Sequence, residues 1–292
     1  MRRPSLPVVL LAIAVSSCSV LPGEDGYLEG VGRIPGGDYE QIVALPDGVE
    51  VEFPDLAGEP LGRNADGARL LMIGDSIFAS TSSRYGDEMC ATLTQLGWNV
   101  ALEAEAGSFV NFGQKVLRAR FDEGWDAVVV FLGTNFDGNV ANYETRLRDI
   151  VEIVWPTPVL LLTTGMFRAE QAEVNQVIWT VRDSYDHVTV LDWSQILDTG
   201  GLLSDDGVHL SRNGRTVLAK AVARAIQFAP SDRVGACLES TFRDDSGVAG
   251  AMPTEDETST EAPVESTAPP ADPPADPPAD PSTDPSTDTT LP

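Results

Sequence analysis

A serine at residue 76 stands where an apolar run ends abruptly. The run Leu70–Ile73 has no polar alternation, which is typical of a strand buried on both faces. Gly74 permits a tight exit from that strand, and the chain from Ile77 onward can become helical. The hydroxyl of Ser76 is therefore expected at the carboxyl edge of a sheet, where unpaired N–H groups favour a developing anion. Ser76 is either a nucleophile or only the cap of a helix, and its partners must decide between the two.

The chain has two histidines, and one of them follows an aspartate in the sequence D-G-V-H. Asp206 precedes His209 by three residues, a spacing that lets a carboxylate reach the imidazole and fix its tautomer. His187 precedes a predicted strand, which places it at the opposite edge of the sheet as a surface or packing residue. A serine nucleophile needs a base within hydrogen-bond reach, and the base needs an orienting acid. Ser76, His209 and Asp206 thus predict acyl transfer, whereas His209 without catalytic duty would merely begin a helix.

Apolar strands alternate with amphipathic helices from Ala68 onward. This alternation predicts an α/β fold, a three-layer α/β/α sandwich with a five-stranded parallel sheet in the flavodoxin-like order 2-1-3-4-5. After the first strand, further strands are expected at Trp98–Glu103, Ala127–Leu132, Val159–Thr163 and Val188–Leu191, and helices at Tyr85–Leu96, Phe112–Phe121, Tyr143–Trp155, Ala169–Tyr185 and Gly214–Phe228.

Four separated blocks of the sequence resemble the SGNH (GDSL-type) hydrolase family. The resemblance covers roughly Leu70 to Phe228 and includes G-D-S near the start and D-G-V-H near the end. It implies the three-layer sandwich and the roles of three residues. Ser76 matches the nucleophile, and Asp206 and His209 match the closing Asp-x-x-His pair.

The same resemblance implies an oxyanion hole. Its donors would be the backbone N–H groups of Ser76 and Gly107 and the side-chain amide of Asn135. The sequence Gly133-Thr134-Asn135 is followed by Phe136, where many members have Gly-x-Asn-Asp. This form, together with D-G-V-H-L, is similar to extracytoplasmic SGNH domains related to polysaccharide and peptidoglycan O-acetyltransferases and acetylesterases.

The expected function is that of a serine ester hydrolase acting on small acyl esters, foremost acetyl esters of cell-envelope carbohydrate, through an acyl-serine. An O-acyltransferase to glycan would use the same residues. Two non-enzymatic alternatives are an envelope glycan-binding lipoprotein and a receiver-like or flavodoxin-like signalling domain, but a pure binder need not retain the complete set. The sequence has no P-loop, no G-x-G-x-x-G and no cysteine–histidine cluster, so no cofactor and no metal are expected.

Four phenylalanines near strand ends bear on the substrate. They line a small acyl pocket or belong to the ordinary core, and the core interpretation is favoured. These residues are Phe78, Phe109, Phe136 and Phe167.

The balance of charge excludes one class of partner. The 292-residue chain has 45 acidic and 19 basic residues and a formal net charge of −26. A nucleic-acid surface needs clustered lysine and arginine, so no nucleic-acid partner is expected. The apolar content of 42% suffices for a core, and the length fits one domain with extensions, expected to be a monomer.

The N-terminus has the pattern of an export signal. Arg2 and Arg3 precede the apolar stretch Leu6–Val15, which is too short to span a bilayer as a helix. Small residues before Cys18 resemble the bacterial lipoprotein box, which implies a signal peptide over residues 1–17 and a lipid anchor on Cys18 at the extracytoplasmic face. An ordinary secretory signal is the alternative.

The rest of the chain divides into a domain and its extensions. Residues 18–67 are interpreted as a tether and an irregular lead-in that partly packs on the domain, and residues 68–243 as the SGNH domain. Residues 244–292 are rich in Pro, Thr and Asp, which predicts a disordered acidic tail. Cys90 and Cys237 are expected near each other, because the first and last helices cover the same face of the sheet. They form either a disulfide or two buried free thiols.

Overall fold

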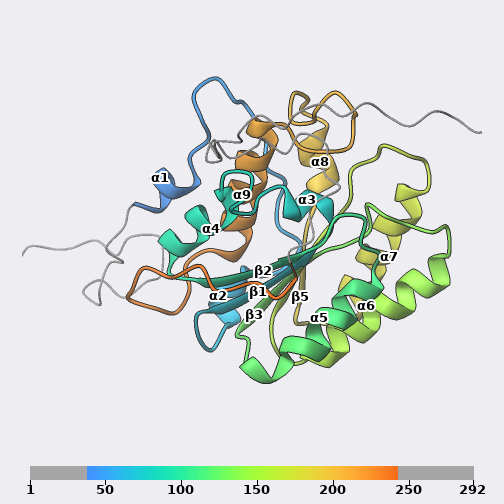
Figure 1. Ribbon diagram of the computed structural model, residues 1–292, viewed down its shortest axis with the longest axis horizontal. Helices are drawn as coiled ribbons and strands as arrows, with labels where there is room; N and C mark the ends of the chain where they lie inside the picture. The colour runs from blue at the N-terminus through green and yellow to red at the C-terminus, as the bar shows by residue number, and fades with distance from the viewer. Residues whose placement is uncertain (1–37, 243–292) are drawn as a thin grey trace, which may run out of the picture. The chain divides into compact units, whose positions relative to one another are not determined.

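The computed structural model describes residues 38–242, in which strands alternate with helices (Figure 1). Five strands of this part form a sheet in the order β2-β1-β3-β4-β5, with every neighbouring pair parallel. The fold class and the strand order are therefore as predicted. The strands are β1 (Arg69–Gly74), β2 (Asn99–Ala104), β3 (Ala127–Phe131), β4 (Val159–Leu162) and β5 (Val188–Leu191).

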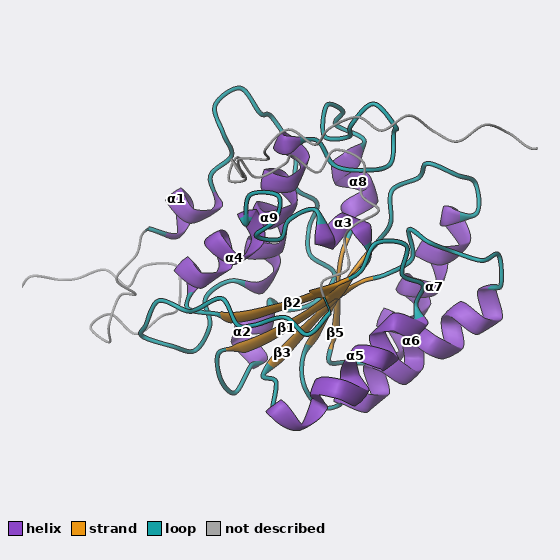
Figure 2. Ribbon diagram, viewed as in Figure 1, coloured by secondary structure: helices purple, strands orange, loops and turns teal. Residues whose placement is uncertain are grey.

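Helices cover both faces of the sheet and complete the three layers (Figure 2). One face is covered by α1 (Tyr39–Val43), α3 (Ser76–Ala79), α4 (Glu88–Leu93), α8 (Trp193–Leu197) and α9 (Arg212–Ile226), with α2 (Leu61–Asn64) packed against α9. The other face is covered by α5 (Asn111–Arg120), α6 (Val140–Val154) and α7 (Gln171–Ser184).

Each face of the sheet has its own hydrophobic core. Along β1, Leu70 and Met72 pack into one core, and Leu71 and Ile73 pack into the other. Successive side chains of a strand point to opposite faces, so a strand buried on both sides must be apolar at every position. This explains the unbroken apolar run that ends before Ser76.

The first long helix is shorter than predicted. The helix expected over Tyr85–Leu96 begins at Glu88, and its last turn is the 3₁₀ segment η1 (Thr94–Leu96). Gly86 and Asp87 have φ angles of 140° and 61°, and such backbone cannot belong to a right-handed helix. The sequence pattern does not predict the helix α8 (Trp193–Leu197). It has five residues, and such a segment is too short to produce a periodic apolar pattern.

Part of the predicted lead-in belongs to the folded unit. Ile42, Val43 and Leu61 are buried in the core on the α9 side, and Ala57 forms an antiparallel bridge with Val190 of β5. The folded unit therefore includes part of the lead-in before residue 68. The apolar residues of this segment are few and irregularly spaced, so the sequence pattern does not reveal that they are buried.

The chain after α9 returns along β2. Residues 236–242, here called the C-terminal strap, pair with the sheet through a parallel bridge between Val100 and Cys237. A disulfide joins Cys237 to Cys90 of α4, with the two Cα atoms 5.8 Å apart. It is the first of the two interpretations offered for this pair.

A buried carboxylate holds the end of the C-terminal strap. The side chain of Glu103 in β2 is fully buried and accepts hydrogen bonds from the backbone N–H groups of Thr241 and Phe242. It also pairs with the guanidinium of Arg120, which is itself buried. A buried carboxylate needs such partners, because burying an unpaired charge is costly.

Several expectations lie outside the described residues. These are the signal peptide over residues 1–17, the lipid anchor on Cys18 and the acidic tail over residues 244–292. Among residues 38–242, no helix combines the length and the apolarity that a membrane crossing needs.

Candidate active site

Ser76 lies at a tight corner between β1 and α3. The strand ends at Gly74, and Ser76 is the first residue of the helix, with only 5% of its surface exposed. The helix folds back closely onto the strand, since a Cβ at Gly74 would lie 2.5 Å from the Cβ of Phe78. Glycine is required here, and the corner fixes the hydroxyl of Ser76 at the carboxyl edge of the sheet.

A continuous chain of hydrogen bonds joins Ser76 to His209 and Asp206. His209 Nε2 lies 3.0 Å from Ser76 Oγ, and His209 Nδ1 lies 2.7 Å from Asp206 Oδ2. The ionised carboxylate only accepts hydrogen bonds, so Nδ1 carries the proton and Nε2 accepts the proton of the serine hydroxyl. The imidazole is thus held in the tautomer that a general base needs.

The loop before α9 is built around Asp206. Its Oδ1 accepts hydrogen bonds from the backbone N–H groups of Val208 and His209, both at 2.9 Å, and from the hydroxyl of Ser204 at 3.0 Å. The hydrogen bond from His209 and these backbone donors hold the pKa of Asp206 well below its usual range. Asp206 therefore remains a carboxylate wherever His209 is a base.

Ser204 is a site residue that the sequence did not reveal. Its N–H donates to the carbonyl oxygen of His209 at 2.7 Å, which closes the loop around Asp206. A serine in a polar loop carries no distinctive pattern, and its spacing of five residues from His209 became meaningful only with the loop in view.

The loops after β2 and β3 reach the same edge as Ser76. Gly74 pairs with Ala104 of β2 and with Phe131 of β3, so the three strands end at the same level. Gly107 follows β2 with a φ angle of 75°, a conformation that favours glycine. Asn135 follows β3.

Asn135 and the turn containing Gly107 contact each other. Asn135 Nδ2 donates to the carbonyl oxygen of Ser108, the residue after Gly107, at 3.2 Å. An amide NH₂ has two N–H groups, so the second is left for an oxygen atom in the site. The structure thus brings the expected donors of the oxyanion hole to the side of the sheet where Ser76 lies.

A small pocket of about 170 Å³ adjoins these residues. Its wall includes the chain neighbours of the site residues, namely Ile77, Thr134, Gly207 and Val208. Apolar side chains from the loop after β4 and from α8 complete it, among them Met166, Phe167, Trp193 and Leu197.

The four phenylalanines divide between core and surface. Phe78 is fully buried, and Phe136 is buried against Tyr143 with the ring centroids 5.9 Å apart, so the core interpretation holds for both. It is wrong for Phe167, which lines the pocket, and for Phe109, which is 47% exposed.

His187 lies at the far edge of the sheet, as expected. It precedes β5, its Nε2 is 3.3 Å from the carbonyl oxygen of Val151, and its ring lies against that of Tyr185. These are packing contacts away from Ser76.

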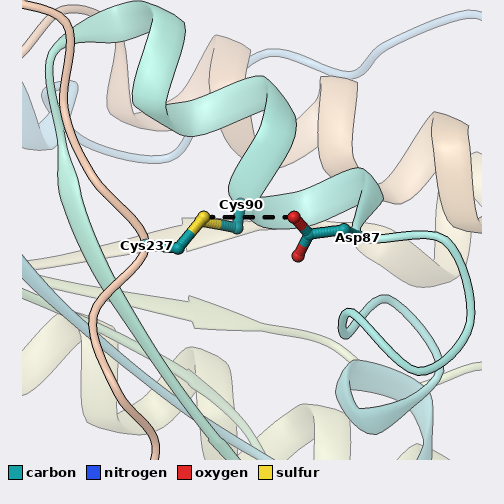
Figure 3. A group of neighbouring side chains, drawn as sticks. All are labelled: Asp87, Cys90 and Cys237. Atoms are coloured by element: carbon teal, nitrogen blue, oxygen red, sulfur yellow. Dashed lines mark hydrogen bonds between the residues drawn. A yellow bond between two sulfur atoms is a disulfide. The ribbon is translucent and has the colours of Figure 1, made fainter.

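One group of potential metal ligands occurs among the described residues. Asp87 lies beside Cys90 and Cys237, with one carboxylate oxygen 4.0 Å from Cys237 Sγ (Figure 3). Both sulfur atoms are committed to the disulfide, and only a thiolate binds metal. This group is therefore a contact of the disulfide and not a metal site.

No protein-family model and no curated protein matches the sequence. Several solved structures are similar. The C-terminal catalytic domain of peptidoglycan O-acetyltransferase A (OatA) from Streptococcus pneumoniae is 18% identical with a TM-score of 0.44, and the match covers 55% of this chain and 93% of that domain. A family 3 carbohydrate esterase from Clostridium thermocellum is 16% identical with a TM-score of 0.44 and covers 54% and 94%. A protein of the G-D-S-L family from Desulfitobacterium hafniense is 19% identical with a TM-score of 0.45 and covers 54% and 99%.

Proposed function

We propose that this chain is a serine esterase of the SGNH type that works through an acyl-serine. The observation that carries the proposal is the hydrogen-bonded series Ser76–His209–Asp206, with distances of 3.0 and 2.7 Å. It is assembled from segments 133 residues apart in the sequence, and each segment is fixed by the fold. A packing role would not require a nucleophile, a base and an orienting acid in line.

The first half of the reaction forms the acyl-serine. Ser76 Oγ attacks the ester carbonyl carbon while His209 Nε2 takes the hydroxyl proton, and Asp206 stabilises the resulting imidazolium. The tetrahedral intermediate collapses, the C–O bond of the ester breaks, and His209 returns the proton to the departing alcohol. The N–H groups of Ser76 and Gly107 and the amide of Asn135 are proposed to stabilise the oxyanion.

The second half of the reaction releases the acyl group. His209 takes a proton from the acceptor, which attacks the acyl-serine, and Ser76 leaves with its proton restored. The side chain of His209 is 24% exposed, so water can reach the acceptor position. Water in that position gives hydrolysis, and a sugar hydroxyl in place of water would make the same site an O-acyltransferase.

The proposed substrates are small acyl esters, foremost acetyl esters of cell-envelope carbohydrate. The pocket of about 170 Å³ is apolar on the side of Met166 and Phe167, which suits a short acyl group. The export pattern of the N-terminus and the sequence Gly133-Thr134-Asn135 support a glycan of the cell envelope as the carrier of the ester. The proposal includes the lipid anchor on Cys18 as the attachment to the membrane.

The test is hydrolysis of p-nitrophenyl acetate by the purified full chain. Ser76→Ala and His209→Ala should each lose turnover, because each removes a reacting group, with circular dichroism unchanged. Matched controls exist in the same chain: Ser184→Ala at the end of α7 and His187→Ala at the far sheet edge should keep wild-type kcat.

A fluorophosphonate probe completes the experiment. It should label the wild type on Ser76 and leave Ser76→Ala unlabelled. Turnover that survives Ser76→Ala would overturn the proposal. Labelling without hydrolysis of acetate, butyrate or octanoate esters would instead point to the acyltransferase.

A further inference from the structure

Asp75 is a fully buried carboxylate that the reaction described above does not use. It has no exposed surface and lies between β1 and Ser76. One carboxylate oxygen accepts a hydrogen bond from the N–H of Ile77 at 3.0 Å, and the other accepts one from the N–H of Thr134 at 3.2 Å. These donors are the immediate chain neighbours of Ser76 and Asn135. A single carboxylate therefore links the nucleophile to the loop that carries the amide of the oxyanion hole.

The same loop is held from its other side by polar groups near the start of α7. Gln171 Nε2 donates to the carbonyl oxygen of Gly133 at 2.9 Å, and Arg168 Nη2 donates to that of Thr134 at 3.2 Å. These contacts fix the loop relative to α7. The contact with Asp75 fixes the loop relative to Ser76. It therefore sets the distance between Asn135 and Ser76, on which stabilisation of the oxyanion depends.

We infer that Asp75 is a positioning residue that sets Asn135 against Ser76, and that its protonation loosens the oxyanion hole and lowers kcat. The inference rests on the proposed function. A protonated carboxyl turns one of its two acceptor oxygens into a hydroxyl, so it no longer accepts well from both N–H groups. The loop would then move away from Ser76, because the N–H of Thr134 would need another acceptor.

The protonation falls in the pH range where a serine esterase works. Burial raises the pKa of Asp75 to about 6, against the hydrogen bonds from Ile77 and Thr134 and the positive charge of His209. The other titratable and charged groups facing this region are Tyr143 of α6, whose hydroxyl donates to the carbonyl oxygen of Leu132, and Arg168. Burial raises the pKa of Tyr143, so it stays neutral.

The test is the pH dependence of kcat for Asp75→Asn, an isosteric change that offers only one acceptor oxygen. At pH 8 the variant should lose about 10- to 100-fold in kcat, as expected for a misplaced oxyanion donor, with KM within about threefold of wild type. In the pH profile of kcat, the fall on the acid side should involve one proton more in the wild type than in the variant, because only the wild type has the carboxyl of Asp75. Asp38→Asn is the matched control, since Asp38 caps α1 through the N–H two residues on, as Asp75 caps α3, and it should keep the wild-type pH profile.

Separate outcomes distinguish this inference from the proposed function. Absence of hydrolysis by the wild type speaks against the function itself. The role of Asp75 is overturned if a folded Asp75→Asn variant keeps the wild-type kcat. It is also overturned if the acid side of its pH profile of kcat has the same slope as that of the wild type. If Asp75→Asn does not fold, the acid side of the wild-type profile decides, because a slope of a single proton there is incompatible with the inference.

Discussion

At the scale of single residues, the side-chain amide of Asn135 should matter for rate and not for folding. One of its N–H groups is bound to Ser108, and the other is the proposed oxyanion donor. Asn135→Ala should lower kcat by about 10²–10³ with KM nearly unchanged, because the interaction forms only in the transition state.

The measurement is steady-state hydrolysis of p-nitrophenyl acetate, with thermal unfolding as a check of the fold. Asn142→Ala on the exposed side of α6 is the matched control and should retain full kcat. If kcat of Asn135→Ala falls by less than about tenfold, the amide of Asn135 is not a donor of the oxyanion hole.

Residue chemistry was the most predictable part of the site. Ser76, Asp206 and His209 could be named because nucleophile, acid and base occur in few combinations and the chain has two histidines. Asp75 and Ser204 could not be assigned roles. Asp75 binds the N–H of Thr134, which is distant in sequence, and Ser204 binds the carbonyl oxygen of His209 within a loop of no regular pattern. An aspartate before a helix predicts a cap, but not the second bond to Thr134.

At the scale of elements, the disulfide should stabilise the fold without serving the reaction. It closes a loop of 147 residues between α4 and the C-terminal strap. Replacing both cysteines by alanine should lower the free energy of unfolding by about 2–5 kcal/mol, because the unfolded chain gains conformational freedom.

The activity of that double variant should equal the wild-type kcat. Cys237 pairs with Val100 near the start of β2, whereas Gly107 follows the end of the same strand. Denaturant unfolding and esterase assays give the two quantities, and reductant added to the wild type should reproduce the loss of stability. A matching fall in kcat would show that the C-terminal strap also positions the site.

Elements were predictable where their apolar pattern was long. The strands and the helices α5, α6, α7 and α9 follow from period and length, with ends displaced by a few residues. The start of α4 was not predictable, because it depends on the left-handed backbone of Gly86 and Asp87. The wall of the pocket depends on α8 and on the loop of Met166 and Phe167, and neither has a periodic pattern.

At the scale of the whole molecule, residues 38–67 should be required for folding. Ile42, Val43 and Leu61 are buried, and Lys220 and Arg224 of α9 donate to the carbonyl oxygens of Ile42 and Val43. Each buried apolar side chain contributes about 1.5–3 kcal/mol. A typical domain has about 5–15 kcal/mol of total stability, so their loss is severe.

The comparison is between a chain that begins at residue 38 and one that begins at residue 68. The first should unfold cooperatively by circular dichroism, and the second should be unfolded or aggregated at the same temperature. Similar unfolding temperatures for the two chains would show that residues 38–67 are not required for folding.

The topology of the whole molecule was predictable because right-handed crossovers leave few arrangements of five parallel strands. The N-terminal extent of the domain was not, because the segment around Ala57 has no regular apolar pattern. Its bridge to β5 uses backbone hydrogen bonds, which do not depend on side-chain type.

Ala57 and the C-terminal strap lie along the two edges of the sheet, and they affect how copies of the protein can associate. The outer strands of an open sheet present unpaired N–H and C=O groups, on which another chain can build. Here Ala57 exchanges two hydrogen bonds of 3.1 Å with Val190 of β5, and Val100 of β2 is bonded to Ala236 and Leu238 at 2.8 and 2.7 Å. Both margins of the sheet are thus partly occupied by the chain itself. Strand-to-strand aggregation is blocked at these points even where many copies share a confined surface.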